Sequence, residues 1–314
     1  MASSGSGYDL SASTFSPDGR IFQVEYATKA VENAGTVLGI QCQDGVVLGC
    51  AKPVHHKMVV ATTGSYKRIH TCDTHIGVAS TGFLPDARVL VQQTVEEAAD
   101  WQEMYGGKIP PHVLAQRLGS YVHYFTLHGA LRPFGAAAVI AGRDEDTQEC
   151  SLYMVEPNGA PYKYYGVATG KGKQAAKTEL EKLNLNKEPI LVADAVKQIL
   201  RILHLLHHEQ KDAKPIEVEV SWICQASGWK HMAVPKDTLK AAEDWAKEQL
   251  EEEEEEEEED MMEMLGFSGF GTTKGKQVAD NVEGAAAGAA GRNKKRQYRQ
   301  YMNRAGGFNR PLQK

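Results

Sequence analysis

The first repeating pattern of apolar and polar residues predicts an amphipathic helix that follows a tight turn. Ser16-Pro17-Asp18-Gly19 suits a turn, because proline presets φ at the second position and aspartate and glycine suit the next two. Beyond it Phe22, Tyr26 and Ala30 fall four residues apart with polar residues between them, and Asn33-Ala34-Gly35 is expected to end the helix. Such a helix cannot bury its apolar face on itself, so we expect it to lie across a sheet or against a neighbouring molecule.

Short apolar runs after this helix predict antiparallel strands. Two apolar runs, at 36–43 and 45–52, meet at Asp44-Gly45. This dipeptide is typical of hairpins because the turn needs positive φ. Further strands, which would make the first third of the chain an antiparallel meander, are expected at 57–62, 67–72 and 75–80.

The rest of the chain alternates between blocks of helices and blocks of strands. Two helices are expected from Pro85 and from about Pro111, since proline suits the first helical turn. The later elements are strands at 134–142, 150–156 and 162–169, helices at 174–183 and 192–207, a strand at 216–223 and a helix from Pro235. This block order predicts a layered α+β fold, and two sheets packed face to face with helices outside would fit it.

The chain changes character past Leu250. Residues 251–260 are nine glutamates and an aspartate, which must remain solvated, so we expect a helical extension here. Gly/Ala-rich stretches and a basic cluster then follow, a composition typical of disorder. We therefore divide the chain into a tail and turn at 1–19, a folded domain at 20–250, an acidic extension at 251–260 and a disordered tail at 261–314.

Composition places the chain among ordinary soluble globular proteins, with 42% hydrophobic and 24% charged residues in 314. The net charge of −6 combines an acidic and a basic segment that largely cancel, so it identifies no partner. Five cysteines without a CxxC pair favour a reducing compartment, with neither disulfides nor a zinc site. No signal peptide is apparent, and no apolar run reaches the ~18–20 residues that span a bilayer. We expect a cytoplasmic and nuclear protein without membrane contact.

Several motifs resemble the eukaryotic proteasome alpha subunits. Tyr8-Asp9, FSPDGR at 15–20, FQVEYA at 22–27 and Gly35-Thr36 match the N-terminal signature of that family with almost no gaps. Further agreement, which extends over roughly residues 6–260, is found at Lys67-Arg68, Asp86-Ala87-Arg88, 131–135, Gly170-Lys171 and 174–178. Within the family the chain most resembles the type-3 group, which occupies the seventh position of the alpha ring.

The resemblance implies both a fold and a role. The fold is a four-layer α/β/β/α sandwich of the N-terminal-nucleophile hydrolase type with an extra N-terminal helix. The role is that of a non-catalytic subunit of the 20S core particle, which forms the seven-membered outer ring, gates substrate admission and docks regulatory particles in ubiquitin-dependent degradation. The implied partners are neighbouring alpha subunits, the beta ring, regulatory particles or activators, and unfolded polypeptides in the pore. No cofactor is implied.

A threonine nucleophile is the first candidate for chemistry. Thr36 precedes a strand, like the N-terminal threonine of catalytic beta subunits, but that mechanism needs a free α-amine as base. Here more than thirty residues precede Thr36. By the resemblance, the nucleophile position is Gly35 and the carboxylate position is Ala51, so neither group is present. The alternative, an N-terminal-nucleophile threonine hydrolase, would need processing that exposes Thr36.

The resemblance assigns a gate and a docking pocket. Tyr8, Asp9, Pro17 and Tyr26 match the residues that gather at the axial pore, although most N-termini are simply frayed. The arginine that usually follows Tyr-Asp is Leu10, which removes a charge that would pair with a neighbouring tail.

The docking pocket falls at Lys67 and Arg68. Taken alone, these are two solvated charges at the start of a strand. By the resemblance, a basic residue here lies between ring subunits and binds the C-terminal carboxylate of an activator.

The remaining polar clusters carry weaker signals. The histidines of the chain, including His204 and His208, lack a third ligand at metal-binding spacing, so we expect no metal site. The basic cluster at 292–304 mixes cations with Tyr298 and Tyr301, as nucleic-acid-binding or nuclear-import segments do. Nucleic acid is nevertheless not among the expected partners. A free interaction module that acts through its charged tails remains an alternative.

Overall fold

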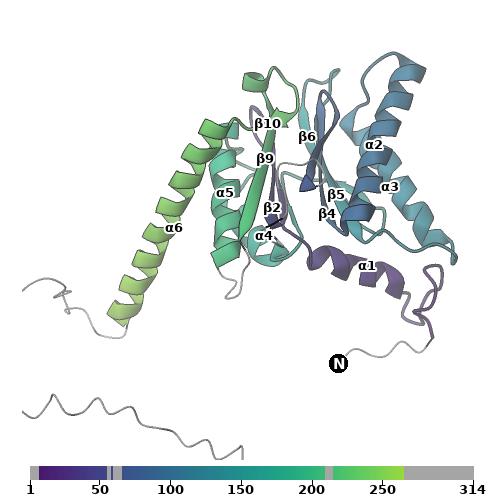
Figure 1. Cartoon of the computed structure of the whole chain (residues 1–314), viewed down its shortest axis with the longest axis horizontal. Coiled ribbons are helices and arrows are strands. Elements are labelled where there is room, and N and C mark those ends of the chain that lie inside the picture. The colour runs from purple at the N-terminus through teal and green to yellow at the C-terminus, as the bar shows by residue number, and fades with distance from the viewer. Residues whose placement is uncertain (1–6, 55–57, 59–65, 209–214, 265–314) are drawn as a thin grey trace, which may run out of the picture. The chain divides into compact units, whose positions relative to one another are not determined.

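Two antiparallel sheets of five strands each form the centre of the fold in this computed structural model, which describes residues 7–54, 58, 66–208 and 215–264 (Figure 1). The first sheet has the order β10-β9-β2-β1-β8 and the second has the order β3-β4-β5-β6-β7. The strands are β1 Val37–Gln41, β2 Gly45–Pro53, β3 Ile69–Asp73, β4 Ile76–Gly82, β5 Ala136–Arg143, β6 Cys150–Val155, β7 Pro161–Lys163, β8 Gly166–Thr169, β9 Ile216–Cys224 and β10 Met232–Ala233.

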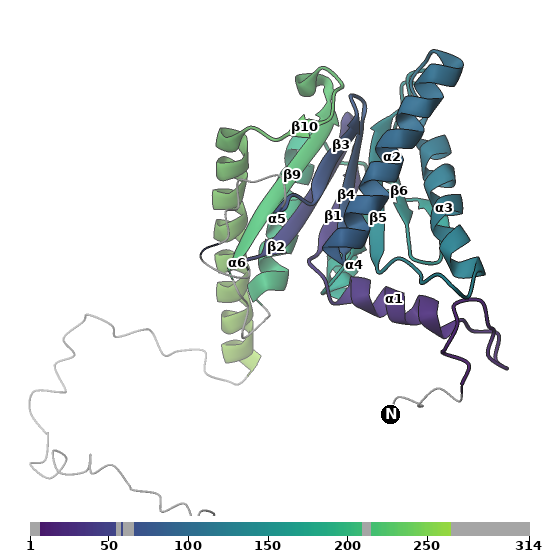
Figure 2. The ribbon, with the colours of Figure 1, turned by 45° about the vertical axis from the view of Figure 1, so that its right-hand side comes forward.

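Helices cover the outer face of each sheet (Figures 1 and 2). Helices α2 (Leu84–Tyr105) and α3 (Pro111–Leu127) pack on the second sheet. Helices α4 (Lys173–Lys182), α5 (Val192–His208) and α6 (Lys236–Met264) cover the first sheet. Helix α1 (Phe22–Glu32) lies across one end of the sandwich. The expected α+β sandwich of four layers, α/β/β/α, with an extra N-terminal helix is confirmed.

Each boundary between neighbouring layers has its own apolar core. Ile40, Ile199 and Leu203 belong to the core between the first sheet and its helices. Val139 and Leu152 belong to the core between the two sheets. The apolar stripe of α2 lies in the third core, against the second sheet, and consists of Ala87, Val91, Val95 and Ala98. Because successive strand residues point to opposite faces, each central strand contributes to two cores and is buried along nearly its whole length.

Two expectations about the strands are wrong. The first third of the chain is not one meander, because the β1–β2 hairpin lies in the first sheet and the β3–β4 pair lies in the second. The segment 162–169 is not one strand either: the chain leaves the second sheet after β7, crosses at Tyr164-Tyr165 and joins the first sheet as β8. Local patterns indicate strands but carry no mark of the sheet to which each strand belongs. The strand expected at 57–62 falls almost wholly outside the described residues.

The acidic run continues the last helix, since α6 extends to Met264. Arg201 of α5 holds the start of this run: its Nε and Nη2 donate to the Glu253 carboxylate at 2.9 Å each, and its Nη1 donates to Glu179 of α4 at 2.9 Å. One arginine thus joins three helices. Two compact units are distinguished, 1–257 and 258–314, and the sandwich lies in the first. No helix among the described residues is long and apolar enough to cross a membrane.

Candidate functional site

The N-terminal turn and helix form as the sequence predicts. The Ser16 carbonyl accepts a hydrogen bond from the Gly19 N–H at 2.9 Å, and the Ser16 N–H donates to the Arg20 carbonyl at 2.9 Å. Gly19 has φ of 73°, a conformation that glycine adopts without steric cost. The buried residues of α1 are Ala27 and Val31, whereas Tyr26 of the predicted apolar face is 40% exposed, so the sandwich covers the side of the helix next to that face.

The four predicted gate residues lie on this same end of the molecule. Tyr8 and Pro17 are exposed, and Tyr26 of α1 is 40% exposed and stacks on Phe22 at a ring-centroid distance of 6.4 Å. The Asp9 carbonyl accepts a hydrogen bond from the Gln23 side chain, which ties the tail to α1. The structure therefore leaves the gate aromatics available to a neighbour. Their role in gating remains a prediction.

The backbone is closely packed at Gly35, the residue at the family's nucleophile position. The Gly35 carbonyl accepts a hydrogen bond from Thr81 Oγ1 at 2.6 Å, and a side chain at Gly35 would place its Cβ 2.5 Å from the Ala51 carbonyl oxygen. The neighbouring Thr36 hydroxyl is buried and donates to the Lys171 carbonyl at 2.5 Å. Gly35, Thr36 and Ala51 thus come together, but their side chains offer neither an activated nucleophile nor a carboxylate.

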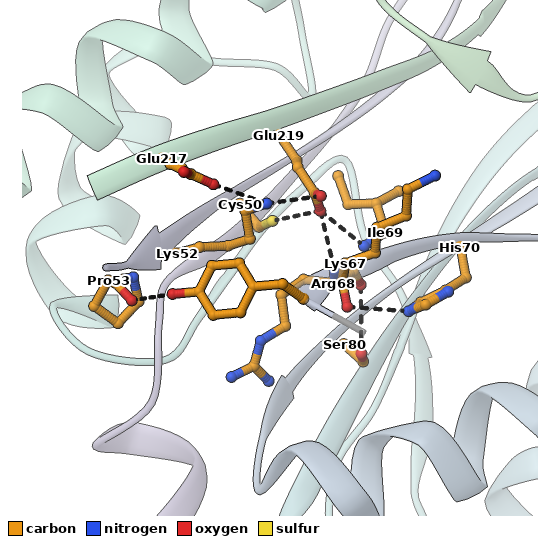
Figure 3. Close-up of polar contacts among 11 residues, drawn as sticks. Cys50, Lys52, Pro53, Lys67, Arg68, Ile69, His70, Ser80, Glu217 and Glu219 are labelled. Carbon is orange, nitrogen blue, oxygen red and sulfur yellow. Dashed lines mark hydrogen bonds and ion pairs between the residues drawn. The ribbon is translucent and has the colours of Figure 1, made fainter. Parts of the chain in front are cut away.

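A buried ion pair lies beside this position (Figure 3). The Lys52 side chain is only 6% exposed, and its Nζ lies 2.9 Å from Glu219 Oε1 and 3.5 Å from Glu217 Oε2. Glu219 Oε2 also accepts the backbone N–H groups of Arg68 at 3.0 Å and Ile69 at 3.3 Å. Glu219 belongs to the first sheet and Ile69 to the second, so this carboxylate joins the two sheets.

The two predicted docking residues differ in their surroundings. Lys67 is exposed, whereas Arg68 is half-buried and its Nη1 donates to the Gly82 carbonyl at 3.2 Å. Burial lowers the pKa of the Arg68 guanidinium from its usual value. Arg68 is therefore the member of the pair that the fold positions, and Lys67 is the solvated one. Binding of an activator's carboxylate by either residue remains a prediction.

An apolar hollow of about 460 Å³ adjoins the gate residue Tyr26. Phe83, which is 59% exposed, lines it, together with Ala30 of α1 and Arg132. Asp86 fixes this wall, because its carboxylate accepts two hydrogen bonds from Arg132, at 2.6 and 2.7 Å, and one from the Gly135 N–H at 2.9 Å. The Arg132 hydrogen bonds lower the pKa of the Asp86 carboxyl. Asp86 and Arg132 lie in two of the family motifs, but their spacing of 46 residues gave no sign of the pairing.

A second group that sequence reasoning missed is His231. Its ring is 9% exposed and lies 2.8 Å from Thr71 Oγ1 in the second sheet and 2.9 Å from Ser221 Oγ in the first. Burial lowers the pKa of His231 to about 4, so the ring is neutral at physiological pH. Its role is to join the sheets. No local pattern marks it, since Thr71 lies 160 residues away and Ser221 lies on the neighbouring strand. Within the described residues, no group of three His, Cys, Asp or Glu side chains is arranged to hold a metal ion.

Comparison with known families gives three matches. The profile described as "Proteasome subunit" matches residues 31–223, and the profile for the N-terminal signature of the A-type proteasome subunits matches residues 8–30. The third profile, described as "U4/U6.U5 small nuclear ribonucleoproteins", matches residues 256–314. The chain therefore resembles two different families in two consecutive parts.

Curated relatives match the first part. The chain is 48% identical over 252 residues to the alpha type-3 proteasome subunit of Arabidopsis thaliana, a match that covers 80% of this chain and 98% of the relative. The protein of the same name from Dictyostelium discoideum is 47% identical over 252 residues, 80% of this chain and 99% of the relative. The probable alpha type-7 proteasome subunit of Saccharomyces cerevisiae is 44% identical over 253 residues, 80% of this chain and 86% of the relative. Together with the two stacked sheets and the helix across their end, these matches show that the chain belongs to the proteasome family as an alpha-ring subunit.

Proposed function

We propose that this chain is a non-catalytic alpha-ring subunit that restricts the admission of unfolded polypeptides and docks regulatory particles, in both cytoplasm and nucleus. Alpha-type subunits assemble with other proteasome subunits, and proteolysis would then come from other members of the particle. The observation that carries the non-catalytic role is the state of Thr36. Its nitrogen lies within the chain, its hydroxyl donates to the Lys171 carbonyl, and Ala51 replaces the carboxylate. A threonine nucleophile needs a base that this arrangement does not supply.

The test is labelling of the assembled particle with a probe that reacts with N-terminal threonines. We expect label on other subunits and none on this chain, whose mass should retain the residues before Thr36. Label on this chain that disappears in Thr36→Val, or a mass lacking those residues, would instead establish the hydrolase alternative. Recovery of the chain as a stable monomer outside any ring would support the interaction-module alternative.

The gating part of the proposal rests on the tail that Gln23 ties to α1. Deletion of residues 2–13 should increase peptide hydrolysis by the resting particle, because the tail would no longer obstruct the pore. A particle that carries Leu10→Ala serves as the matched control, because the Leu10 side chain is 86% exposed. Unchanged hydrolysis after the deletion would contradict a gating role.

The docking part rests on Arg68, whose guanidinium is positioned by the Gly82 carbonyl. A charge-assisted hydrogen bond to a carboxylate is stronger than a neutral one, so Arg68→Ala should weaken binding of an activator's C-terminal peptide by about tenfold or more. Lys67→Ala is the matched control and should have little effect, because Lys67 is exposed. A larger loss of binding with Lys67→Ala than with Arg68→Ala would instead identify Lys67 as the docking residue.

A second function is favoured by the match of residues 256–314 to a ribonucleoprotein family. We propose that this segment associates with small nuclear ribonucleoproteins independently of the ring. The full chain and a chain ending at Glu255 should be precipitated from nuclei and the bound RNA sequenced. Enrichment of small nuclear RNA with the full chain alone would support this function. Equal recovery, or a mature protein that lacks the segment, would contradict it.

A further inference from the structure

A polar cavity of about 620 Å³ lies at the end of the sandwich opposite α1. Strand β1 runs from Val37, near the Gly35 position, to Gln41, which lines this cavity. The remaining walls come from the β1–β2 turn, the loop between β5 and β6, the crossing at Tyr164-Tyr165, and Trp229. The gate and docking residues are not part of it. The cavity is therefore separate from the site described above.

One buried acceptor in this cavity has no partner among the described residues. Gln41 Nε2 donates to the Cys150 carbonyl at 2.9 Å, which orients the amide. Gln41 Oε1 is then buried and accepts no hydrogen bond from the described part of the chain. A buried polar atom in this condition is costly, because it has lost its hydrogen bonds to water and gained none in return. The geometry thus favours a hydrogen-bond donor at this point.

Backbone strain gathers at the same cavity. Three non-glycine residues in the described chain have positive φ, and two of them, Gln148 at 62° and Trp229 at 61°, line this cavity. Such a conformation is strained for a residue with a side chain, and strained residues cluster at functional sites. The Trp229 ring lies under the Arg143 guanidinium, which is 3.9 Å from the ring centroid. Arg143 also donates to the Gln148 side-chain oxygen.

The carboxylates that line the cavity can accept hydrogen bonds from a cation. Asp44 and Glu149 contribute two of them, beside the Lys163 ammonium group in the lining and the Arg143 guanidinium over Trp229. The Cys42 thiol has its pKa raised by burial and, to a lesser degree, by the Asp44 carboxylate. Burial also raises the pKa of the Cys150 thiol to about 11, so neither thiol is a reactive nucleophile. Asp44 Oδ1 accepts the Val192 N–H at 2.8 Å, which leaves Oδ2 for a second donor.

We propose that this cavity binds a planar guanidinium group, carried by a small molecule or by an arginine side chain of a protein partner. The arrangement around Arg143 shows how this surface accepts such a group, with an aromatic face and an amide oxygen as partners. The cavity repeats these partners with Tyr164, Tyr165 and Gln41 Oε1, and it adds carboxylates. A guanidinium has five donors in a fixed plane and so matches an amide oxygen beside a carboxylate better than an ammonium does.

The test is titration of the full chain by calorimetry with three probes. Agmatine carries a free guanidinium, acetyl-Gly-Arg-Gly-amide carries it on a peptide, and acetyl-Gly-Lys-Gly-amide is the ammonium control. We expect saturable binding of at least one guanidinium probe and binding of the lysine peptide that is about tenfold weaker or more. Preference for agmatine would identify a small molecule as the ligand. Preference for the arginine peptide would identify a protein partner.

Three variants test whether the guanidinium probe binds in this cavity. Gln41→Met removes the orphan acceptor at similar volume, and Glu149→Gln removes an exposed carboxylate without disturbing the core. Each should weaken binding of the guanidinium probe by about tenfold, as expected for the loss of a hydrogen bond to a charged group. Asp146→Asn, on the same loop but outside the lining, is the control and should bind normally. If Gln41→Met fails to fold, Glu149→Gln still tests the proposal. Absence of saturable binding, equal binding of the lysine peptide, or normal binding by Glu149→Gln would overturn the proposal.

Discussion

Strand β9 of the first sheet is joined to strand β3 of the second at two neighbouring places, and the two links have different chemistry. The charged link consists of Lys52, Glu219 and the backbone N–H groups of Arg68 and Ile69. The neutral link consists of Ser221, His231 and Thr71. Both fix the relative position of two sheets that share no backbone ladder.

The difference shows how a buried group can be satisfied in two ways. Glu219 neutralises Lys52 and at the same time accepts backbone donors, so its removal would leave the buried Lys52 with only the 3.5 Å contact to the exposed Glu217 carboxylate. His231 stays neutral between two hydroxyl groups, so its link needs no counter-charge but is sensitive to protonation. The charged link should therefore fail by mutation, and the neutral link should fail in acid.

The largest expected effect is that of Glu219→Leu. It leaves the Lys52 charge, on a side chain that is 6% exposed, compensated only by the Glu217 carboxylate at 3.5 Å. We expect the free energy of unfolding of the full chain, measured in urea, to fall by about 3–5 kcal/mol. The double variant Lys52→Met with Glu219→Leu removes both charges and should lose less than Glu219→Leu alone. A double variant that is no more stable than the single one would show that the charge is not the cause.

The second largest effect is expected from acid, which acts on the neutral link. The pKa of His231 is lowered to about 4 by burial, from 6.5 in an exposed chain, so the unfolded state takes up a proton first as pH falls. The stability from the neutral ring is complete above pH 6.5 and is lost between pH 6.5 and 4, by about 3 kcal/mol in total. Denaturation curves at several pH values should show this loss. His231→Asn, which does not titrate, should lack this component, and an identical pH profile would contradict the assignment.

A steric change tests the packing of the same ring. A Cβ added at Gly77 would overlap His231 Cδ2, so Gly77→Ala must displace the ring from Thr71 and Ser221. We expect a loss of about 1–3 kcal/mol in the free energy of unfolding. Gly107→Ala is the matched control, since nothing lies within 4 Å of its Cβ position. A stable Gly77→Ala variant would show that the ring can move without breaking the link.

The smallest expected effect is that of Glu217→Gln. Glu217 lies opposite Lys52 in the strand register, yet its side chain is 38% exposed and its oxygen is 3.5 Å from Nζ. We expect a change of about 0–1 kcal/mol, as for other exposed ion pairs. Thermal unfolding in low and high salt measures it. A loss as large as that of Glu219→Leu would mean that Lys52 depends on both carboxylates.

Much of the fold and part of the candidate site follow from the sequence. The turn at Ser16 is predictable because it depends on the backbone preferences of a few adjacent residues. The hairpin at Asp44-Gly45 forms as predicted, but neither residue has the positive φ on which that expectation rested. The stripe of α2 is predictable because helical spacing places its members on one face. The absence of a carboxylate at Ala51 and of a free amine at Thr36 is likewise visible in the sequence once the family resemblance is recognised.

Other features are decided only by the tertiary structure. The assignment of β3 and β8 to their sheets, the pairing of Asp86 with Arg132, and the two links of β9 all join residues far apart in the chain. The sequence alone determined where most helices and strands lie and which chemistry is missing, because those properties reside in neighbouring residues. Burial determined that Arg68 rather than Lys67 is positioned, and that His231 is neutral, because burial and partner distance exist only after the layers have packed.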